Sequence, residues 1–368
     1  MKKRFEREEK WLIDEGTGRR LRQITDHPSI HHHPFFLIPV YDSAMRYLYF
    51  VSHRTGSPQV FVEDKADRCF YQLSDVAALN EWSVHPWENL VYYIADGCAL
   101  CTDAVTGKTE VLLDGGKVAE LSGGAINPGT TPITPGTTAV SACGRFWAIR
   151  IVDRDGYSIW IYDRQAGVWA KEYTGPMVSH MQFCPDDHSL LFFAGPLTDR
   201  VWVLNRKTGQ ARRTFQRDAA AKQWITHESW IPGRKELSLV DWPKGILAVN
   251  VETGAVRRIA SFNAWHAIAN DQGTRIVADT NFPDRGLMLC DVDAQNAKGG
   301  LLCRPQATSL GAHWAEPFPY DDGPIQVYAP QHTHPHPRFS PDGEKVVFTS
   351  DKSGFAQLFE VELPQELR

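Results

Sequence analysis

Asn205-Arg-Lys-Thr-Gly209 and Asn250-Val-Glu-Thr-Gly254 are two copies of one turn, and the regular return of this turn decides the fold. Short apolar runs flank each copy, and the last glycine supplies the left-handed backbone that a tight hairpin needs. Related turns occupy Asp14–Gly18, Glu63–Asp67, Asp103–Gly107 and Asp163–Gly167, with a degenerate seventh at Asp291–Gln295. The six intervals between residues 14 and 291 average about 46 residues, which indicates a repeated structural unit.

A second series of turns alternates with the first, and Ser340-Pro-Asp-Gly343 is its clearest member. Each of its seven turns leads into a short strand-like run, at Tyr47–Val51, Leu90–Ala95, Phe146–Val152, Ser189–Ala194, Glu236–Val240, Arg275–Asp279 and Lys345–Thr349. Two hairpin turns and about four short strands per period are typical of a β-propeller blade. We predict an all-β, seven-bladed β-propeller that forms a single domain over residues 1–368. The alternative is two stacked β-sandwiches, which would not require a constant period.

The two ends of the chain are expected to share the last blade. The C-terminal part ends with the strand-like runs Lys345–Thr349 and Ala356–Leu363, with no fourth strand after them. We therefore expect the N-terminal strand Arg19–Thr25 to close the last blade from outside, which removes an open sheet edge. Trp11–Asp14 also resembles a strand and competes with Ala356–Leu363 for the third position.

Composition narrows the class of partner. The 368 residues are 42% hydrophobic and 23% charged, which is ordinary for a globular protein. The net charge of −5 argues against a nucleic-acid partner, and the apolar runs are too short to span a membrane. The charged start of the chain has no apolar signal region, so we expect a cytoplasmic protein whose seven cysteines are reduced. The sequence leaves the oligomeric state unknown.

Histidines recur at one depth of the predicted blades. The innermost strand of a blade ends just before the second-series turn, and four blades place a histidine there. These are His180, His227 and His336, five residues before Pro185, Pro232 and Pro341, and His266, four residues before Asn270. Because a strand alternates faces with period two, His332, His334 and His336 are expected to share a face. Clustered imidazoles predict a metal site, and the alternative is that each histidine simply fills the channel.

At this point the sequence resembles a known family. His227-Glu-Ser-Trp230, Gln331-His-Thr-His-Pro-His336 and Phe339-Ser-Pro-Asp-Gly343 resemble motifs of the oligogalacturonate lyases, polysaccharide lyase family 22. Trp11–Gly18, His31–Pro39, Ser52–Gly56 and Asn80–Trp82 extend the resemblance over the whole chain. The resemblance implies a carbon–oxygen lyase that breaks down pectin-derived oligogalacturonides with a divalent metal, manganese (Mn2+), as cofactor.

The resemblance also implies roles for individual residues. Gln331, His334 and His336 fit the C-terminal metal ligands, and His266 fits the separate upstream ligand. Strand alternation points to His332 instead of Gln331, so both stay candidates. His227 fits the catalytic base, and Arg200 fits an arginine that binds the reacting sugar.

Further substrate-binding candidates are His180, Arg54 and Trp82. For Arg54 the alternative is a charge at a strand end on the surface. For Trp82 the alternative is core packing.

These residues suit β-elimination in a uronic acid chain. A base removes the C5 proton and the C4–O bond breaks, while a divalent cation neutralises charge on the C6 carboxylate. Two other functions remain open: a non-catalytic TolB-like propeller used as an interaction scaffold, and a lyase acting on another uronate oligosaccharide.

Overall fold

The computed structural model describes residues 2–121, 138–153, 156–281, 283–307 and 333–365. Gln331 and His332 lie outside the described residues. The described residues form seven antiparallel sheets and one short helix, α1 (Gly115–Leu121). Within these ranges, no helix has both the length and the apolar character needed to traverse a bilayer.

The chain falls into two compact units. The first comprises Met1–Phe5, Tyr41–Tyr49 and Thr55–Arg213, and the second comprises Glu6–Val40, Phe50–Arg54 and Thr214–Arg368. A single domain over residues 1–368 therefore stays a prediction.

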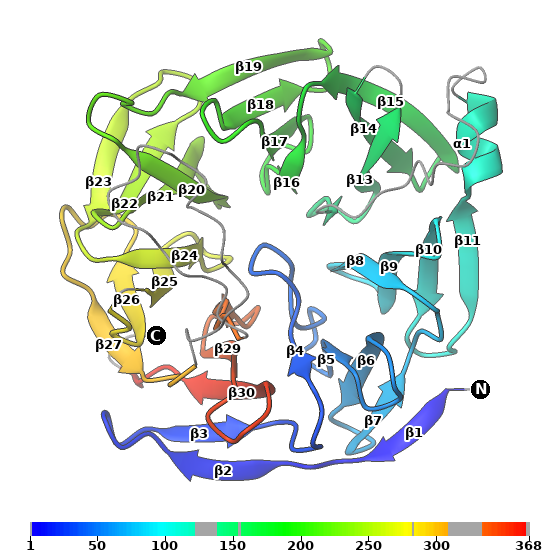
Figure 1. Ribbon diagram of the computed structural model, residues 1–368, viewed down its shortest axis with the longest axis vertical. Coiled ribbons are helices and arrows are strands. Elements are labelled where there is room, and N and C mark those ends of the chain that lie inside the picture. The colour runs from blue at the N-terminus through cyan, green and yellow to red at the C-terminus, as the bar shows by residue number, and fades with distance from the viewer. Residues whose placement is uncertain (1, 122–137, 154–155, 282, 308–332, 366–368) are drawn as a thin grey trace. The chain divides into compact units, whose positions relative to one another are not determined.

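Three four-stranded sheets belong to the first unit, and in each the strands are neighbours in chain order (Figure 1). One contains β8 (Leu79–Val84), β9 (Leu90–Ala95), β10 (Cys98–Asp103) and β11 (Thr109–Leu113). The next contains β12 (Ala139–Val140), β13 (Phe146–Asp153), β14 (Gly156–Asp163) and β15 (Val168–Gly175). The third contains β16 (Ser179–Phe183), β17 (Leu190–Ala194), β18 (Val201–Asn205) and β19 (Gln210–Phe215).

Two further four-stranded sheets belong to the second unit and follow the same order. One contains β20 (Trp224–Ile231), β21 (Glu236–Trp242), β22 (Gly245–Asn250) and β23 (Val256–Ala260). The other contains β24 (Ala264–Ala269), β25 (Arg275–Thr280), β26 (Leu287–Asp291) and β27 (Gly300–Cys303).

The two remaining sheets have five strands each. One has the order β1 (Lys3–Glu6), β7 (Cys69–Gln72), β6 (Gln59–Asp64), β5 (Tyr47–Ser52) and β4 (His31–His32). The other has the order β2 (Lys10–Ile13), β3 (Arg20–Gln23), β30 (Gln357–Glu362), β29 (Lys345–Ser350) and β28 (Arg338–Phe339). Seven sheets, five with the predicted four strands and two with a fifth, confirm the all-β repeat.

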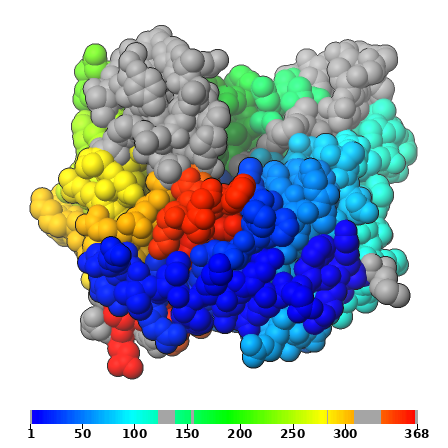
Figure 2. All heavy atoms as spheres, turned by 60° about the horizontal axis from the view of Figure 1, so that its bottom comes forward, coloured from blue at the N-terminus to red at the C-terminus, as the bar shows by residue number. Residues whose placement is uncertain are grey.

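The predicted closure by the N-terminal strand is confirmed. β3 pairs antiparallel with β30, and Leu21 lies opposite Val361. β2 pairs with β3 from outside, so Trp11 belongs to a fifth strand and does not compete for the third position. The blue N-terminal residues lie directly against red C-terminal residues on the surface (Figure 2).

The repeated turn forms for a local reason. In Asp163–Gly167 the amide of Gly167 donates to the carbonyl of Asp163 over 2.8 Å, and the Asp163 side chain accepts the amide of Gln165. Gly167 has a φ of 67°, which glycine adopts without steric cost. The same glycine-closed geometry recurs at Gly18, Gly107, Gly209 and Gly254.

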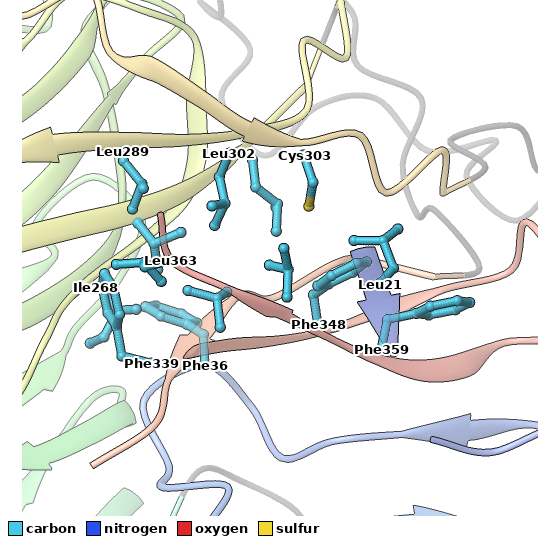
Figure 3. Packing of buried hydrophobic residues seen from close by; sticks show 14 of the residues in the cluster. Leu21, Phe36, Ile268, Leu289, Leu302, Cys303, Phe339, Phe348, Phe359 and Leu363 are labelled. Atoms are coloured by element: carbon cyan, nitrogen blue, oxygen red, sulfur yellow. The ribbon is translucent and has the colours of Figure 1, made fainter. Parts of the chain in front are cut away.

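A hydrophobic core joins the terminal strands of the second unit (Figure 3). Leu21 of β3 packs with Phe348 and Phe359 of β29 and β30, and all three are fully buried. Leu289 and Leu302 of the preceding sheet line the other side. Full burial of one such side chain contributes about 1.5–3 kcal/mol, so this core holds β3 in place.

Candidate functional site

Three histidines from distant parts of the chain meet in the second unit. His266 lies on β24, and His334 and His336 lie just before β28. One ligating nitrogen of each lies within 4.8 Å of the others, and the two Nε2 atoms of His266 and His336 are 3.0 Å apart. The structure thus brings together three of the four residues that the resemblance assigned to a metal.

The first strands of four sheets contain a bulge, and three of these bulges carry a histidine. The pairing is interrupted between Ser179 and Gln182 in β16, Thr226 and Ser229 in β20, and Ala264 and Ala267 in β24. The fourth bulge, between Leu79 and Trp82 in β8, has no histidine. In a bulge two residues oppose one on the partner strand, which re-aims a side chain. His180 and His227 have φ angles of 48° and 50° within their bulges. Such values are uncommon for residues other than glycine and often occur at functional positions.

The strand alternation expected for His334 and His336 is wrong, and His332 lies outside the described residues. Residues 333–337 are not in a strand, and β28 begins only at Arg338. Pro335 and Pro337 have no amide hydrogen to donate to a ladder. His336 has a left-handed φ of 46°, so an irregular backbone, and not period two, brings its ring to His334. The two rings are stacked with centroids 5.2 Å apart.

Asp279 supports this cluster from β25. Its carboxylate accepts the backbone amide of His266 over 2.6 Å and lies 2.9 Å from Nδ1 of the same residue. It also accepts the backbone amide of His336 over 3.2 Å. With Nδ1–H donated to Asp279, Nε2 of His266 keeps its lone pair for a cation. The side chain of Asp279 is only 2% exposed.

The donor set fits a divalent cation. Burial lowers the pKa of His334, and burial with the neighbouring imidazoles lowers the pKa of His336 well below its ordinary value. Both rings are therefore neutral at physiological pH, as metal binding requires. Nδ1 of His334 is buried and has no hydrogen-bond partner in the described part of the chain. Imidazole nitrogens suit first-row divalent metals such as Fe, Ni, Cu or Zn.

His227 lies beside the three histidines without joining them. Its ring centroid is 4.1 Å from that of His266 and 4.9 Å from that of Trp265. Phe36 is fully buried, with its centroid 5.9 Å from the His227 ring and 5.3 Å from the His266 ring. The residue expected to be the base thus shares an apolar-walled cluster with the expected ligands.

His180 and Arg200 form a separate pair in the first unit. Nη2 of Arg200 lies 3.4 Å from Nδ1 of His180. Burial, and then the charges of Arg200 and Arg150, lower the pKa of His180 to about 3. Trp82 of β8 is 4% exposed, which fits its core-packing alternative. Substrate contacts by these residues stay predictions.

Arg54, in the second unit, already holds a carboxylate of the chain. Its guanidinium pairs with Glu8 at 2.8 Å and 3.2 Å and approaches Nε2 of His31 at 3.1 Å. Its side chain is 3% exposed, so the alternative of a surface strand-end charge is wrong. Its contact with substrate stays a prediction.

Sequence reasoning missed Asp279 and Phe36. Asp279 lies in the predicted strand Arg275–Asp279, and the antiparallel pairing of β24 with β25 brings it beside His266. A buried acidic residue in the strand next to a candidate ligand was the available signal.

Comparison with known proteins gives the family. A family model described as oligogalacturonate lyase matches residues 165–367. The oligogalacturonate lyase of Dickeya dadantii is 26% identical over 202 residues, which cover 52% of this chain and 51% of that protein. The oligogalacturonide lyase of Pectobacterium atrosepticum is 27% identical over 212 residues, with the same shares covered. The matched part thus spans about half the length of these curated relatives.

A solved structure gives the fold. An oligogalacturonate lyase in complex with manganese resembles this chain with a TM-score of 0.80 and 19% identity, over 100% of this chain and 99% of that one. The likeness confirms the seven-bladed β-propeller. Since the family model covers more than half of the chain, the chain belongs to the oligogalacturonate lyase family.

Proposed function

We propose that the chain is a metal-dependent lyase that cleaves short pectin-derived galacturonate oligosaccharides by β-elimination. The convergence of His266, His334 and His336, with His227 beside them, is the observation that supports this most directly. Family membership supports the same reaction.

His266, His334 and His336 would hold the cation, with Gln331 proposed as the fourth ligand. Mn2+ is the proposed ion because the similar solved structure is a manganese complex. A divalent cation, when bound, supplies Lewis acidity that offsets negative charge on a C6 carboxylate. Neutral ligands suit that purpose because they add no negative charge of their own.

His227 is proposed as the base that takes the C5 proton. An imidazole ordinarily titrates near neutral pH, so a neutral ring can accept a proton there. The C5–H electron pair becomes the C4–C5 double bond, and the C4–O bond breaks with its electron pair on oxygen, which takes a proton from solvent as the next sugar leaves as an alcohol. Trp265 and Phe36 pack against the His227 ring and hold its orientation.

Arg200 is proposed to bind a carboxylate of the substrate. Its guanidinium can present two parallel N–H donors to such a group. His180 beside it is neutral, so it does not add a second positive charge next to the guanidinium. A cytoplasmic location and the absence of nucleic-acid partners belong to the same proposal.

The test follows elimination directly. The product carries a conjugated unsaturated acid that absorbs in the ultraviolet, so purified protein with Mn2+ should raise absorbance on digalacturonate. Ulvan and glucuronan oligomers, tested in parallel, separate a lyase for another uronate. Metal analysis of the same preparation tests the scaffold alternative, because a scaffold would hold no stoichiometric metal. Absence of product from all three substrates would refute the proposal.

A further inference from the structure

Polar side chains gather where the first strands of three sheets of the first unit approach one another. β12 contacts both β8 and β16. Glu81 lies in the bulge of β8, and His180 lies in the bulge of β16. From β13, Nη1 of Arg150 donates to the carbonyl of Val178, just before the start of β16, over 3.3 Å. Glu81, Arg150 and His180 therefore come from three different sheets to one region.

Arg150 differs from other arginines of its unit. Five of them pair with carboxylates: Arg46 with Asp64, Arg145 with Asp163, Arg164 with Glu88, Arg206 with Glu172 and Arg213 with Asp199. Arg150 forms no ion pair with any described residue, and its Nε atom is buried without a hydrogen-bond partner. Burial lowers the pKa of Arg150, because a desolvated cation without an ion-pair partner is unfavourable, and the nearby Tyr157 and Glu81 offset this only in part. An anion bound there would relieve this cost.

A second guanidinium approaches the same histidine. Arg200 contacts His180 at 3.4 Å, and the charges of Arg200 and Arg150 both lower the pKa of that imidazole. His180 is therefore neutral and able to exchange hydrogen bonds with a neutral group. Two guanidinium groups near one neutral imidazole favour an anionic ligand.

Glu81 narrows the chemistry of that ligand. Burial raises the pKa of Glu81 and the charge of Arg150 lowers it, so the two groups interact without reaching ion-pair distance. A carboxyl group here would repel a doubly charged phosphate but would accept hydrogen bonds from hydroxyl groups. A sugar acid offers one carboxylate together with several ring hydroxyls.

We propose that Arg150, together with Arg200, binds the carboxylate of a uronate residue, with His180 and Glu81 hydrogen-bonded to its hydroxyls. This inference rests on the proposed function and adds to it a residue that selects acidic over neutral sugars. Arg150 is assigned to binding and not to proton transfer, so its loss should affect substrate affinity more than the chemical step.

The test compares Arg150→Gln with Arg145→Gln, a matched control. Arg145 precedes the same strand, but its side chain is 44% exposed and its guanidinium is already paired with Asp163. On digalacturonate with Mn2+, Arg150→Gln should raise KM about 10-fold or more while kcat stays within about threefold. Arg145→Gln should match the wild type in both constants. Arg150→Lys keeps the charge but loses the planar fork, so an intermediate KM is expected and supplies a second variant if Arg150→Gln does not fold.

A binding measurement gives a readout independent of turnover. In a His227→Ala background, calorimetry should show digalacturonate binding more tightly than its methyl ester, and adding Arg150→Gln should reduce that preference. If the wild type cleaves digalacturonate and folded Arg150 variants keep its KM and its preference for the acid, this inference is wrong and the proposed function stands. If the wild type neither binds nor cleaves digalacturonate, the proposed function fails, and this inference fails with it.

Discussion

Replacing Asp279 by asparagine is expected to weaken metal binding selectively. The carboxylate receives two hydrogen bonds from His266, at 2.6 Å and 2.9 Å, and one from the amide of His336, at 3.2 Å. An amide has only one acceptor oxygen, so at least one donor loses its partner. The amide NH2 group also favours the His266 tautomer whose Nε2 carries hydrogen and cannot ligate. Loss of such a supporting partner typically weakens metal binding about 10- to 100-fold, or about 1.4–2.7 kcal/mol.

Calorimetric titration with Mn2+ measures the change, and Asp42→Asn is the matched control. Asp42 is also a buried carboxylate, and it accepts the amide of Tyr47 over 2.7 Å in the first unit. Both variants should lose about 1–3 kcal/mol of unfolding free energy, but only Asp279→Asn should lose affinity for Mn2+. Asp279→Glu, which keeps the charge, checks whether the carboxylate itself matters. A folded Asp279→Asn protein with the wild-type Kd for Mn2+ would refute the supporting role.

Three further outcomes are expected. His227→Ala should abolish turnover of digalacturonate while bound Mn2+, measured by metal analysis, stays stoichiometric; loss of metal would make His227 a ligand. His334→Ala should lose metal and activity together, and full activity in metal-free protein would contradict the Lewis-acid role. Burial, with the charge of Arg54, lowers the pKa of His31 to about 3 in the folded state, so the unfolded state binds its proton first as pH falls below about 6.5. This one group should reduce the free energy of unfolding by about 1.4 kcal/mol per pH unit below that point. In urea unfolding at pH 5 to 7, the free energy of unfolding of His31→Gln should therefore fall less steeply with decreasing pH than that of the wild type.

The repeat was predictable because its determinants are local. An aspartate or asparagine that caps a turn and a glycine with positive φ fix each hairpin within five residues, as at Asp163–Gly167. The run Leu90–Ala95 coincides with β9 to the residue. Closure by β3 followed from counting strands, because a sheet edge left unpaired is unfavourable.

The fifth strands were harder to predict because their pairing is tertiary. Lys3–Glu6 joins a sheet as β1 only because β7 offers an edge, and its short charged sequence gives no period to detect. Trp11 was correctly placed in a strand, but tertiary pairing decides whether its strand or Ala356–Leu363 takes the third position in the sheet. Arg54 similarly owes its burial to Glu8, which lies 46 residues away in the sequence.

At the candidate site, the number of residues between a histidine and the turn that follows it identified the histidines. The alternation of side chains along a strand did not. Counting back five residues from the proline found His180, His227 and His336. All three have a left-handed backbone, so this spacing marks the same local structure in each sheet. Period two holds only in a regular strand, and the two prolines around His336 exclude one. Asp279 and Arg150 were not predicted from the sequence because their importance depends on contacts between strands. Asp279 contacts His266 on the neighbouring strand, and Nε of Arg150 has no hydrogen-bond partner in the described part of the chain.

The left-handed histidines also bear on why the site is built this way. A residue other than glycine in that conformation costs about 1–3 kcal/mol, so glycine or asparagine would serve the bulge better if stability alone decided. Histidine nevertheless occupies the position in two bulges, at His180 and His227, and at the irregular segment that carries His336. Two of these rings contact His266 in the second unit, and the third contacts Arg200 in the first. Strain of the same kind at His180 therefore supports a ligand-binding role for the His180–Arg200 region on grounds that do not depend on the metal.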